Sequence, residues 1–244
     1  LLILLQSLKK EFLMILDAFK FTNDLFSKNF SKFLVIIFPV YVIIFLVYSL
    51  ISPIPGNEFG TTNTSFASYF LELVTNLLTL YSVILSILLI DDICKEKKRS
   101  ITNYFYLGAY LFPKILVINL ITGFAVFFGL LALIIPGLYV SARLFFASYL
   151  AIIFDEGILN SLKKSIDITQ DKGWKVLGYV FAVTIPLLFI MILAIIGPGI
   201  FLVEENMKTF MAIVFFVTFL FMIYITIYGY RLLINLMETS DESI

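Results

Sequence analysis

The clearest indication of the fold comes from residues 69–99, which read YFLELVTNLLTLYSVILSILLIDDICKEKKR. The part from 69 to 90 is mostly apolar and carries a single charged residue, Glu72. A helix rises about 1.5 Å per residue and the hydrocarbon core of a bilayer is about 30 Å thick, so about 20 apolar residues span it. A basic cluster follows directly, at Lys95, Lys97, Lys98 and Arg99. The stretch therefore predicts a transmembrane helix anchored on the cytoplasmic side.

Five further apolar runs have a similar length, at 33–51, 115–135, 138–154, 176–196 and 210–233. Hydrophobic residues make up 61% of the chain and charged residues only 14%, against about 25% charged residues in soluble domains. The sequence predicts an all-α integral membrane protein with a six-helix transmembrane domain over 33–234. Pro136 and Gly137 are a turn signal and separate the third run from the fourth.

The basic residues indicate the orientation of these spans. Of the 17 lysines and arginines, 15 fall in or beside the N-terminal segment, the loops after the second and fourth spans, and the inner ends of the third and sixth spans. Lys208 is the one basic residue on the opposite side, and Arg143 lies within a span. Because positive charge is retained inside, we expect both termini, including the short tail 235–244, in the cytoplasm.

Three segments are predicted to be amphipathic rather than spanning: the N-terminal segment 1–32, residues 101–112 and residues 155–172. Such helices lie in the headgroup plane with their apolar side toward the lipid. The alternative is that they are linkers packed on the bundle. The run 1–5 is short for a signal-peptide core and no small-residue cleavage site follows it, so we expect the first span to be retained.

A weak repeat also runs along the chain. A lysine starts three of the spans and a proline follows 21–23 residues later, in the pairs Lys32 and Pro53, Lys114 and Pro136, and Lys175 and Pro198. This pattern predicts three helical hairpins of the same orientation, a parallel repeat of the kind that some transporters use. Alternatively, the marks reflect only that every hairpin needs a turn and an inner anchor.

The second span carries a polar face. Its members fall within a sector of about 120° on a helix with 100° per residue; they are Ser68, Glu72, Thr75, Asn76, Thr79, Ser82 and Ser86. Polar groups in hydrocarbon need partners, so we expect this helix at the centre of the bundle. The face either packs against a neighbouring helix, bonding across the interface, or lines a polar path for a ligand.

Arg143 is the one cation well inside a span. A charge at the bilayer centre costs about 2.5–3.5 kcal/mol on insertion scales. Glu72 lies at a similar depth when both are counted from the outer surface, so the sequence predicts a buried ion pair between Glu72 and Arg143. Such a pair would act either as a structural clamp or as part of a site for a charged headgroup or solute.

Signals for catalysis are missing from the sequence. The chain has one cysteine, Cys94, and no histidine, which excludes an intrachain disulfide and the commonest general base. It contains no phosphate-cradling glycine loop, nucleophile elbow or metal-spaced cluster. We therefore predict no catalytic residue, no metal site, no cofactor and no enzyme activity.

The segment from Ile134 to Leu177 reads IIPGLYVSARLFFASYLAIIFDEGILNSLKKSIDITQDKGWKVL. It resembles uncharacterised bacterial inner-membrane proteins of the YciC type, and the membrane domain attached to some glycerophosphoryl diester phosphodiesterases. The resemblance rests on a Pro-Gly turn, an arginine in the following span, an acidic-Gly end, an SLKKS helix and a Trp-Lys start. The matching residues are Pro136, Gly137, Arg143, Glu156, Gly157, Ser161, Leu162, Lys163, Lys164, Ser165, Trp174 and Lys175. It implies a multi-pass protein of the bacterial inner membrane, without phosphodiesterase activity.

These observations leave three hypotheses for function. The first is a non-enzymatic role in membrane organisation or in lipid and envelope homeostasis. The lipid headgroup or partner would then bind at the basic segments, with contacts from Lys97, Lys98, Arg99, Lys163, Lys164, Trp174 and Lys175. The second is a transporter or permease subunit with a path along the second span, and the third is a membrane anchor for a separate soluble enzyme. The expected partners are membrane lipids and a membrane or cytoplasmic protein, with no nucleic acid; the oligomeric state is left open.

Overall fold

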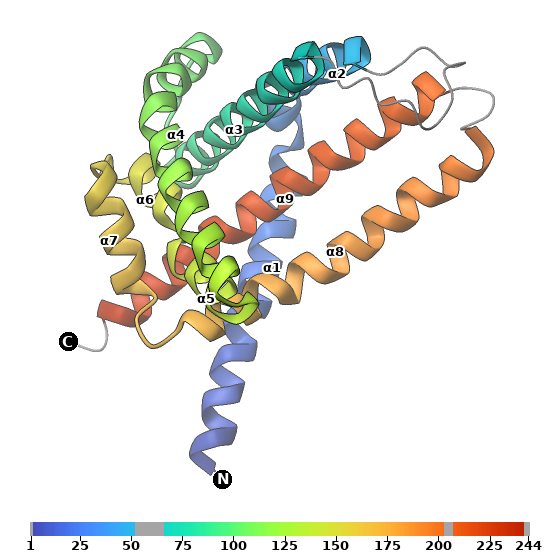
Figure 1. The fold of residues 1–244 in the computed structure, drawn as a ribbon. Helices are drawn as coiled ribbons and strands as arrows, with labels where there is room; N and C mark the ends of the chain where they lie inside the picture. The colour runs from blue at the N-terminus through green and yellow to red at the C-terminus, as the bar shows by residue number, and fades with distance from the viewer. Residues whose placement is uncertain (1, 52–65, 203–206, 242–244) are drawn as a thin grey trace.

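The structure, a computed structural model, describes residues 2–51, 66–202 and 207–241. Every regular element in these ranges is an α-helix (Figure 1). The helices are α1 (Leu2–Ile36), α2 (Phe38–Ile51), α3 (Phe66–Cys94), α4 (Ile101–Ala132), α5 (Ile134–Leu144), α6 (Ala147–Ile153), α7 (Ile158–Ile168), α8 (Gly173–Leu202) and α9 (Met207–Asp241). Predicted features at 52–65, including Pro53, and at 203–206 lie outside the described residues.

Five helical stretches in the described ranges are long and apolar enough to cross a membrane, at 68–94, 101–132, 134–153, 173–196 and 209–239. A sixth is obtained if the bent pair Glu11–Ile36 and Phe38–Tyr48 counts as one span. The chain therefore has the helices of a multi-pass, all-α membrane protein. α3 is the most buried of the five stretches, and its buried residues lie in its second half.

The first apolar run, predicted as the span 33–51, is divided by a bend of 53° between α1 and α2. Pro39 lies in the first turn of α2, and its ring cannot accommodate the helical position of the Val35 carbonyl, which accounts for a bend at this point. α1 also departs from helical geometry at Asn29, at φ −120° and ψ 15°. The N-terminal segment therefore continues into the first apolar run through a bent helix, without a loop.

α4 and α5 form a hairpin whose turn differs from the prediction. The break falls at Leu133, which is extended at φ −168° and ψ 153°, whereas Pro136 and Gly137 lie within α5. Proline is tolerated in a first turn because its missing N–H has no partner there anyway. A Cβ on Gly129 would lie 2.8 Å from the Gly137 Cα, so the two glycines allow the helices to touch.

Two other predicted boundaries, at 101–112 and at 196, are wrong. Residues 101–112 are not a separate interfacial helix, because α4 continues through Pro113 to Ala132. The fourth predicted span, 138–154, coincides closely with the candidate span 134–153, which has a short break between α5 and α6 at Phe145 and Phe146. α8 does not stop at 196 but runs past Pro198 to Leu202. Hydrophobicity marks the apolar runs, but it does not show where a helix with an internal proline continues.

Consecutive helices pack as neighbours, with α2 against α3, α4 against α5 and α8 against α9. α9 also packs on α1, α2 and α3, so it joins the first and last parts of the chain. Side chains from both halves of the chain meet in the core. Its largest fully buried members are Phe33, Ile37, Ile84, Leu85, Ile87, Leu89, Ile90, Ile115, Ile118, Phe146, Phe219 and Tyr228.

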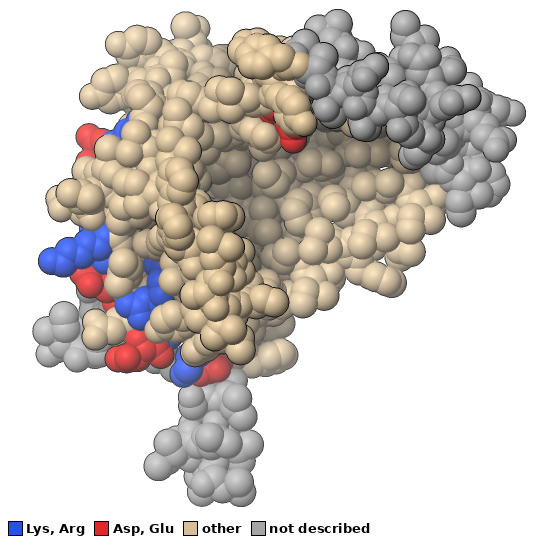
Figure 2. All heavy atoms as spheres, in the orientation of Figure 1, with Lys and Arg blue, Asp and Glu red and all other residues tan. Residues whose placement is uncertain are grey.

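Charged and apolar side chains occupy different parts of the surface. Figure 2 shows Lys, Arg, Asp and Glu gathered mainly on the side that carries α7 and the end of α9, whereas the surface over α8 is uncharged in this view. Large apolar side chains are exposed along α8 and around the α4–α5 turn, such as Phe189, Phe128 and Ile134. A surface of this kind suits lipid rather than water. We call the part formed by residues 91–100 and 154–175 the charged side.

Candidate functional site

The C-terminal end of α3 is closed by backbone hydrogen bonds. The N–H of Lys97 donates to the carbonyl of Asp92 at 2.8 Å, and the N–H of Glu96 donates to that of Ile93 at 3.3 Å. Glu96 has a positive φ of 52°. This pattern is the Schellman motif, in which one left-handed residue reverses the chain and satisfies the last carbonyls. It turns the loop 95–100 back across the end of the helix.

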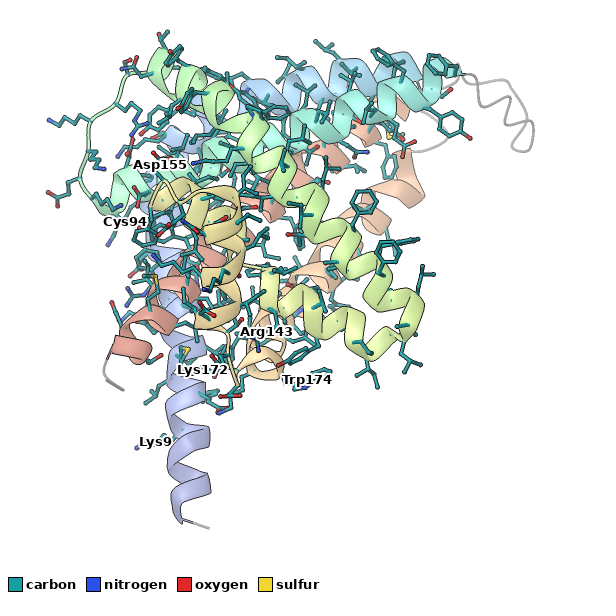
Figure 3. The ribbon with its side chains drawn as sticks, turned by 60° about the vertical axis from the view of Figure 1, so that its left-hand side comes forward. Lys9, Cys94, Arg143, Asp155, Lys172 and Trp174 are labelled. Atoms are coloured by element: carbon teal, nitrogen blue, oxygen red, sulfur yellow. The ribbon has the colours of Figure 1, made fainter. Side chains whose placement is uncertain are left out.

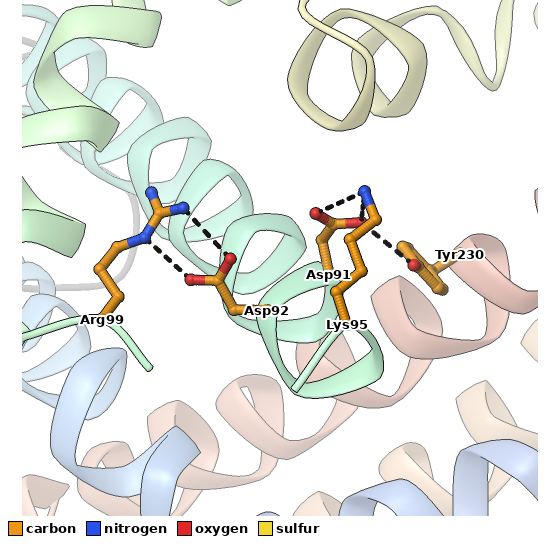
Figure 4. Close-up of polar contacts among 5 residues, drawn as sticks. All are labelled: Asp91, Asp92, Lys95, Arg99 and Tyr230. Carbon is orange, nitrogen blue, oxygen red and sulfur yellow. Dashed lines mark hydrogen bonds and ion pairs between the residues drawn. The ribbon is translucent and has the colours of Figure 1, made fainter. Parts of the chain in front are cut away.

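Two adjacent carboxylates hold this loop in place (Figure 4). Asp92 receives Arg99 in a bidentate pair, with Nε to Oδ2 at 2.9 Å and Nη2 to Oδ1 at 3.1 Å. Asp91 pairs with Lys95 Nζ at 2.7 Å and accepts a hydrogen bond from the Tyr230 hydroxyl of α9 at 3.2 Å. Both carboxylates are buried. A buried charge requires such partners, so the two pairs fix the loop to α3 and α3 to α9.

The sequence interpretation did not include Asp91 and Asp92. A signal was present, because Asp91 and Lys95 have the i,i+4 spacing of a helical ion pair with the acid on the N-terminal side. The bidentate contact of Asp92 with Arg99 could not be anticipated in the same way, since it depends on the reversal of the chain at Glu96.

Beside this loop lies a cavity of about 670 Å³. The end of α1, the end of α3, the loop and the start of α4 line it, and it is open on one side. Its polar lining comes from Asn29, Ser31, Lys32, Asp92, Glu96, Lys97, Lys98, Arg99 and Tyr104, and its apolar lining from Val35, Ile36, Leu89, Ile93 and Ile101. The structure thus brings the predicted contact residues Lys97, Lys98 and Arg99 together with Lys32 around one hollow.

The other predicted basic residues lie apart from this cavity. Lys164 pairs with Glu156 at 2.9 Å, and its Nζ lies 4.8 Å from the centre of the Phe154 ring. Lys175 pairs with Glu11 of α1 at 2.6 Å. Lys163 is exposed, as is the ring of Trp174. The charged side therefore contains structural ion pairs as well as lysines that face outward.

Arg143 connects α5 with α7 (Figure 3). Its Nη2 donates to the carbonyl of Ile166 at 3.0 Å, and its Nη1 donates to the Tyr139 hydroxyl at 3.1 Å. In return the hydroxyl of Ser165 donates to the Arg143 carbonyl at 2.7 Å. The Tyr139 and Trp174 rings lie 5.4 Å apart beside it. Arg143 therefore fastens α7 to α5, and the contact of Tyr139 with Trp174 joins the start of α8 to α5.

The predicted ion pair between Glu72 and Arg143 is wrong. Glu72 is exposed near the other end of α3, and no ion pair to it is found in the described chain. The guanidinium of Arg143 instead finds a carbonyl on α7. The error arose from counting the depth of Arg143 from Gly137 along a straight span, whereas the short α5 brings Arg143 to the charged side.

The polar face of the second span divides into two parts. Ser82 and Ser86 are buried, Thr75 and Thr79 are half-buried, and Asn76 is exposed like Glu72. Hydroxyl groups along the face donate to carbonyls of their own helix at 2.7–2.8 Å, from Thr75, Thr79, Ser82 and Ser86. Ser68, in the first turn of α3, also interacts with another group. These hydroxyls are satisfied without a ligand.

One member of the face borders a cavity. Thr79 lies with Tyr41 and Thr218 around a hollow of about 230 Å³ between α2, α3 and α9. The buried hydroxyl of Tyr41 has no hydrogen-bond partner in the described part of the chain. Thr75 and Asn76 do not line it, so the predicted path is not continuous along the face.

No protein-family model, curated protein or solved structure matches the chain. The described ranges also contain no cluster of three or more His, Cys, Asp or Glu side chains placed to hold a metal ion.

Proposed function

We propose that this chain is a non-enzymatic, multi-pass protein of a bacterial inner membrane that binds anionic lipids or a protein partner through its charged side. It would serve membrane organisation or envelope homeostasis. In this proposal the bent pair α1–α2 is the first of six spans, both termini are cytoplasmic, and α7 and the first part of α1 lie at the cytoplasmic interface. The resemblance to YciC-type proteins is consistent with this role.

One observation carries the proposal. Carboxylates engage Lys95, Arg99, Lys164 and Lys175, whereas the exposed Lys97, Lys98 and Lys163 have no ion pair within the described residues. The paired residues hold the loop and the helices in place. The remaining lysines are free to attract an anionic lipid surface, at about 1 kcal/mol for each, or an acidic partner.

The test is to isolate the full chain in native nanodiscs and to quantify the lipids and proteins that accompany it by mass spectrometry. We expect enrichment of anionic lipids over the bulk membrane, or a stoichiometric partner. A variant with Lys97, Lys98 and Lys163 changed to Gln should lose that enrichment. A chain that carries lipids in bulk proportions and no partner would contradict the proposal, and a soluble enzyme as the partner would identify an anchor.

A permease subunit is the second candidate, favoured by the cavity between α2, α3 and α9 with the unpartnered Tyr41 hydroxyl. Proteoliposomes can be incubated with a cell extract and the accumulated solutes identified by mass spectrometry. Transport predicts a solute whose uptake falls when Tyr41 is changed to Phe. Protein-free liposomes with the same solute content would exclude this function.

A further inference from the structure

We propose that the cavity beside the loop 95–100 is a binding site for the phosphate-bearing headgroup of an anionic glycerophospholipid. This inference rests on the proposed function and makes its lipid branch specific to one site. The volume of about 670 Å³ lies within the range of about 300–1,000 Å³ that is usual for ligand pockets.

The charge of the lining favours an anion. Four cations, Lys32, Lys97, Lys98 and Arg99, face two carboxylates, Asp92 and Glu96, which leaves a formal charge of +2. Asp92 is already neutralised by Arg99. No ion pair within the described residues engages the three lysines, so their ammonium groups remain available for a phosphate.

The start of α4 adds to this attraction. Ser100 caps the helix, and its Oγ accepts from the N–H of Asn103 at 3.3 Å. The N–H groups of Ile101 and Thr102 precede the first intrahelical hydrogen bond, and Ile101 lines the cavity. The N-terminus of this 32-residue helix therefore presents a partial positive charge to the same hollow, an arrangement that favours phosphate.

The apolar lining distinguishes a lipid from a soluble phosphate. Val35 and Ile101 are exposed by 53% and 49% beside the lysines, and Leu89 and Ile36 form a buried apolar floor. The glycerol backbone and the first acyl carbons of a phospholipid would cover these side chains, whereas inorganic phosphate would leave them in water. The long apolar helix α3 ends at this cavity and the long apolar helix α4 begins there. The cavity therefore lies at the same end of both helices.

The test is native mass spectrometry of the detergent-purified full chain with added phosphatidylglycerol or phosphatidylcholine. We expect wild type to prefer phosphatidylglycerol, and a K32Q/K97Q/K98Q variant to bind it at least about tenfold more weakly. The matched control is K9Q/K20Q/K28Q, which removes three exposed lysines outside the cavity lining and should change binding by less than about twofold. Glu96→Gln removes a carboxylate from the lining and should strengthen binding, a gain that misfolding cannot produce.

Each outcome decides a separate point. If wild type prefers phosphatidylglycerol and the cavity triple variant binds like its control, the site is wrong and lipid binding elsewhere stands. If wild type shows no preference, the lipid branch of the proposed function fails with it. Displacement of phosphatidylglycerol by equimolar glycerol phosphate would overturn the lipid assignment in favour of a soluble ligand.

Discussion

The hydroxyl of Tyr230, near the end of α9, donates a hydrogen bond to the buried carboxylate of Asp91 at the end of α3. The contact joins residues 139 positions apart in the sequence. It places the last helix directly against the carboxylate that also binds Lys95. Through Asp91, α9 is therefore linked to the start of the loop 95–100.

Changing Tyr230 to Phe removes this hydrogen bond and leaves the ring in place. The free energy of unfolding should fall by about 1 kcal/mol, because Lys95 still compensates the carboxylate. Chemical unfolding in detergent micelles measures the change. Tyr106→Phe is the control, since Tyr106 is 74% exposed and its variant should match wild type. A Tyr230→Phe protein as stable as wild type would show that the contact has no stabilising effect.

The two partners of the bidentate pair should be unequal in their effects. Arg99→Gln leaves the Asp92 side chain, only 2% exposed, without its cation, whereas Asp92→Asn leaves an Arg99 side chain that is 22% exposed and can reach water. We expect a loss of about 3 kcal/mol for Arg99→Gln and about half of that for Asp92→Asn. Melting temperatures in one detergent give the order.

The double variant Arg99→Gln with Asp92→Asn tests the same asymmetry. With neither charge present, its stability should lie close to that of Asp92→Asn rather than at the sum of both losses. A larger loss for Asp92→Asn than for Arg99→Gln would contradict the buried state of the carboxylate.

Arg143→Gln should loosen α7, because it removes the hydrogen bond to the Ile166 carbonyl. We expect a loss of about 2 kcal/mol and faster proteolysis within residues 154–172. Glu72→Gln should leave both measurements unchanged. A double-mutant cycle of Arg143 and Glu72 should give a coupling free energy below about 0.5 kcal/mol. A larger coupling would show that the two residues interact after all.

Gly137→Ala should destabilise the α4–α5 hairpin by about 1–3 kcal/mol, because the added Cβ would lie 2.7 Å from the Leu130 backbone nitrogen. Gly123→Ala in the same hairpin is the matched control. Nothing lies within 4 Å of a Cβ at that position, so alanine should be neutral or stabilise the helix by up to about 1 kcal/mol. Thermal unfolding of the two variants side by side decides the matter.

The apolar runs could be predicted because a helix that crosses a bilayer needs a sufficient length and an apolar composition. Both can be read directly from the sequence. The runs 69–90, 176–196 and 210–233 all lie within single helices, α3, α8 and α9. The turn at Leu133 could not be placed in this way. Proline is compatible with both a turn and a first helical turn, and the close approach of Gly129 to Gly137 is a contact between helices.

The candidate site was predicted only in part. The basic residues Lys97, Lys98 and Arg99 follow from their place after an apolar run. The contribution of Lys32 depends on how α1 meets α3, which the local pattern does not encode. The partner of Arg143 was missed for a more general reason. The partner is the backbone carbonyl of Ile166. Every residue has a backbone carbonyl, so no residue type in the sequence marks this partner.

The attachment of α7 has a consequence for its response to ionic strength. At this junction Arg143 and Ser165 bond to backbone carbonyls, so no pair of opposite full charges is involved. Lys114 reaches the exposed Asp155 at the entrance to α7 by a surface ion pair, which salt screens readily. Added salt should therefore weaken the contact at the N-terminal end of α7 before the contacts at its middle. The helix would then move about its contact with Arg143 and stay attached there.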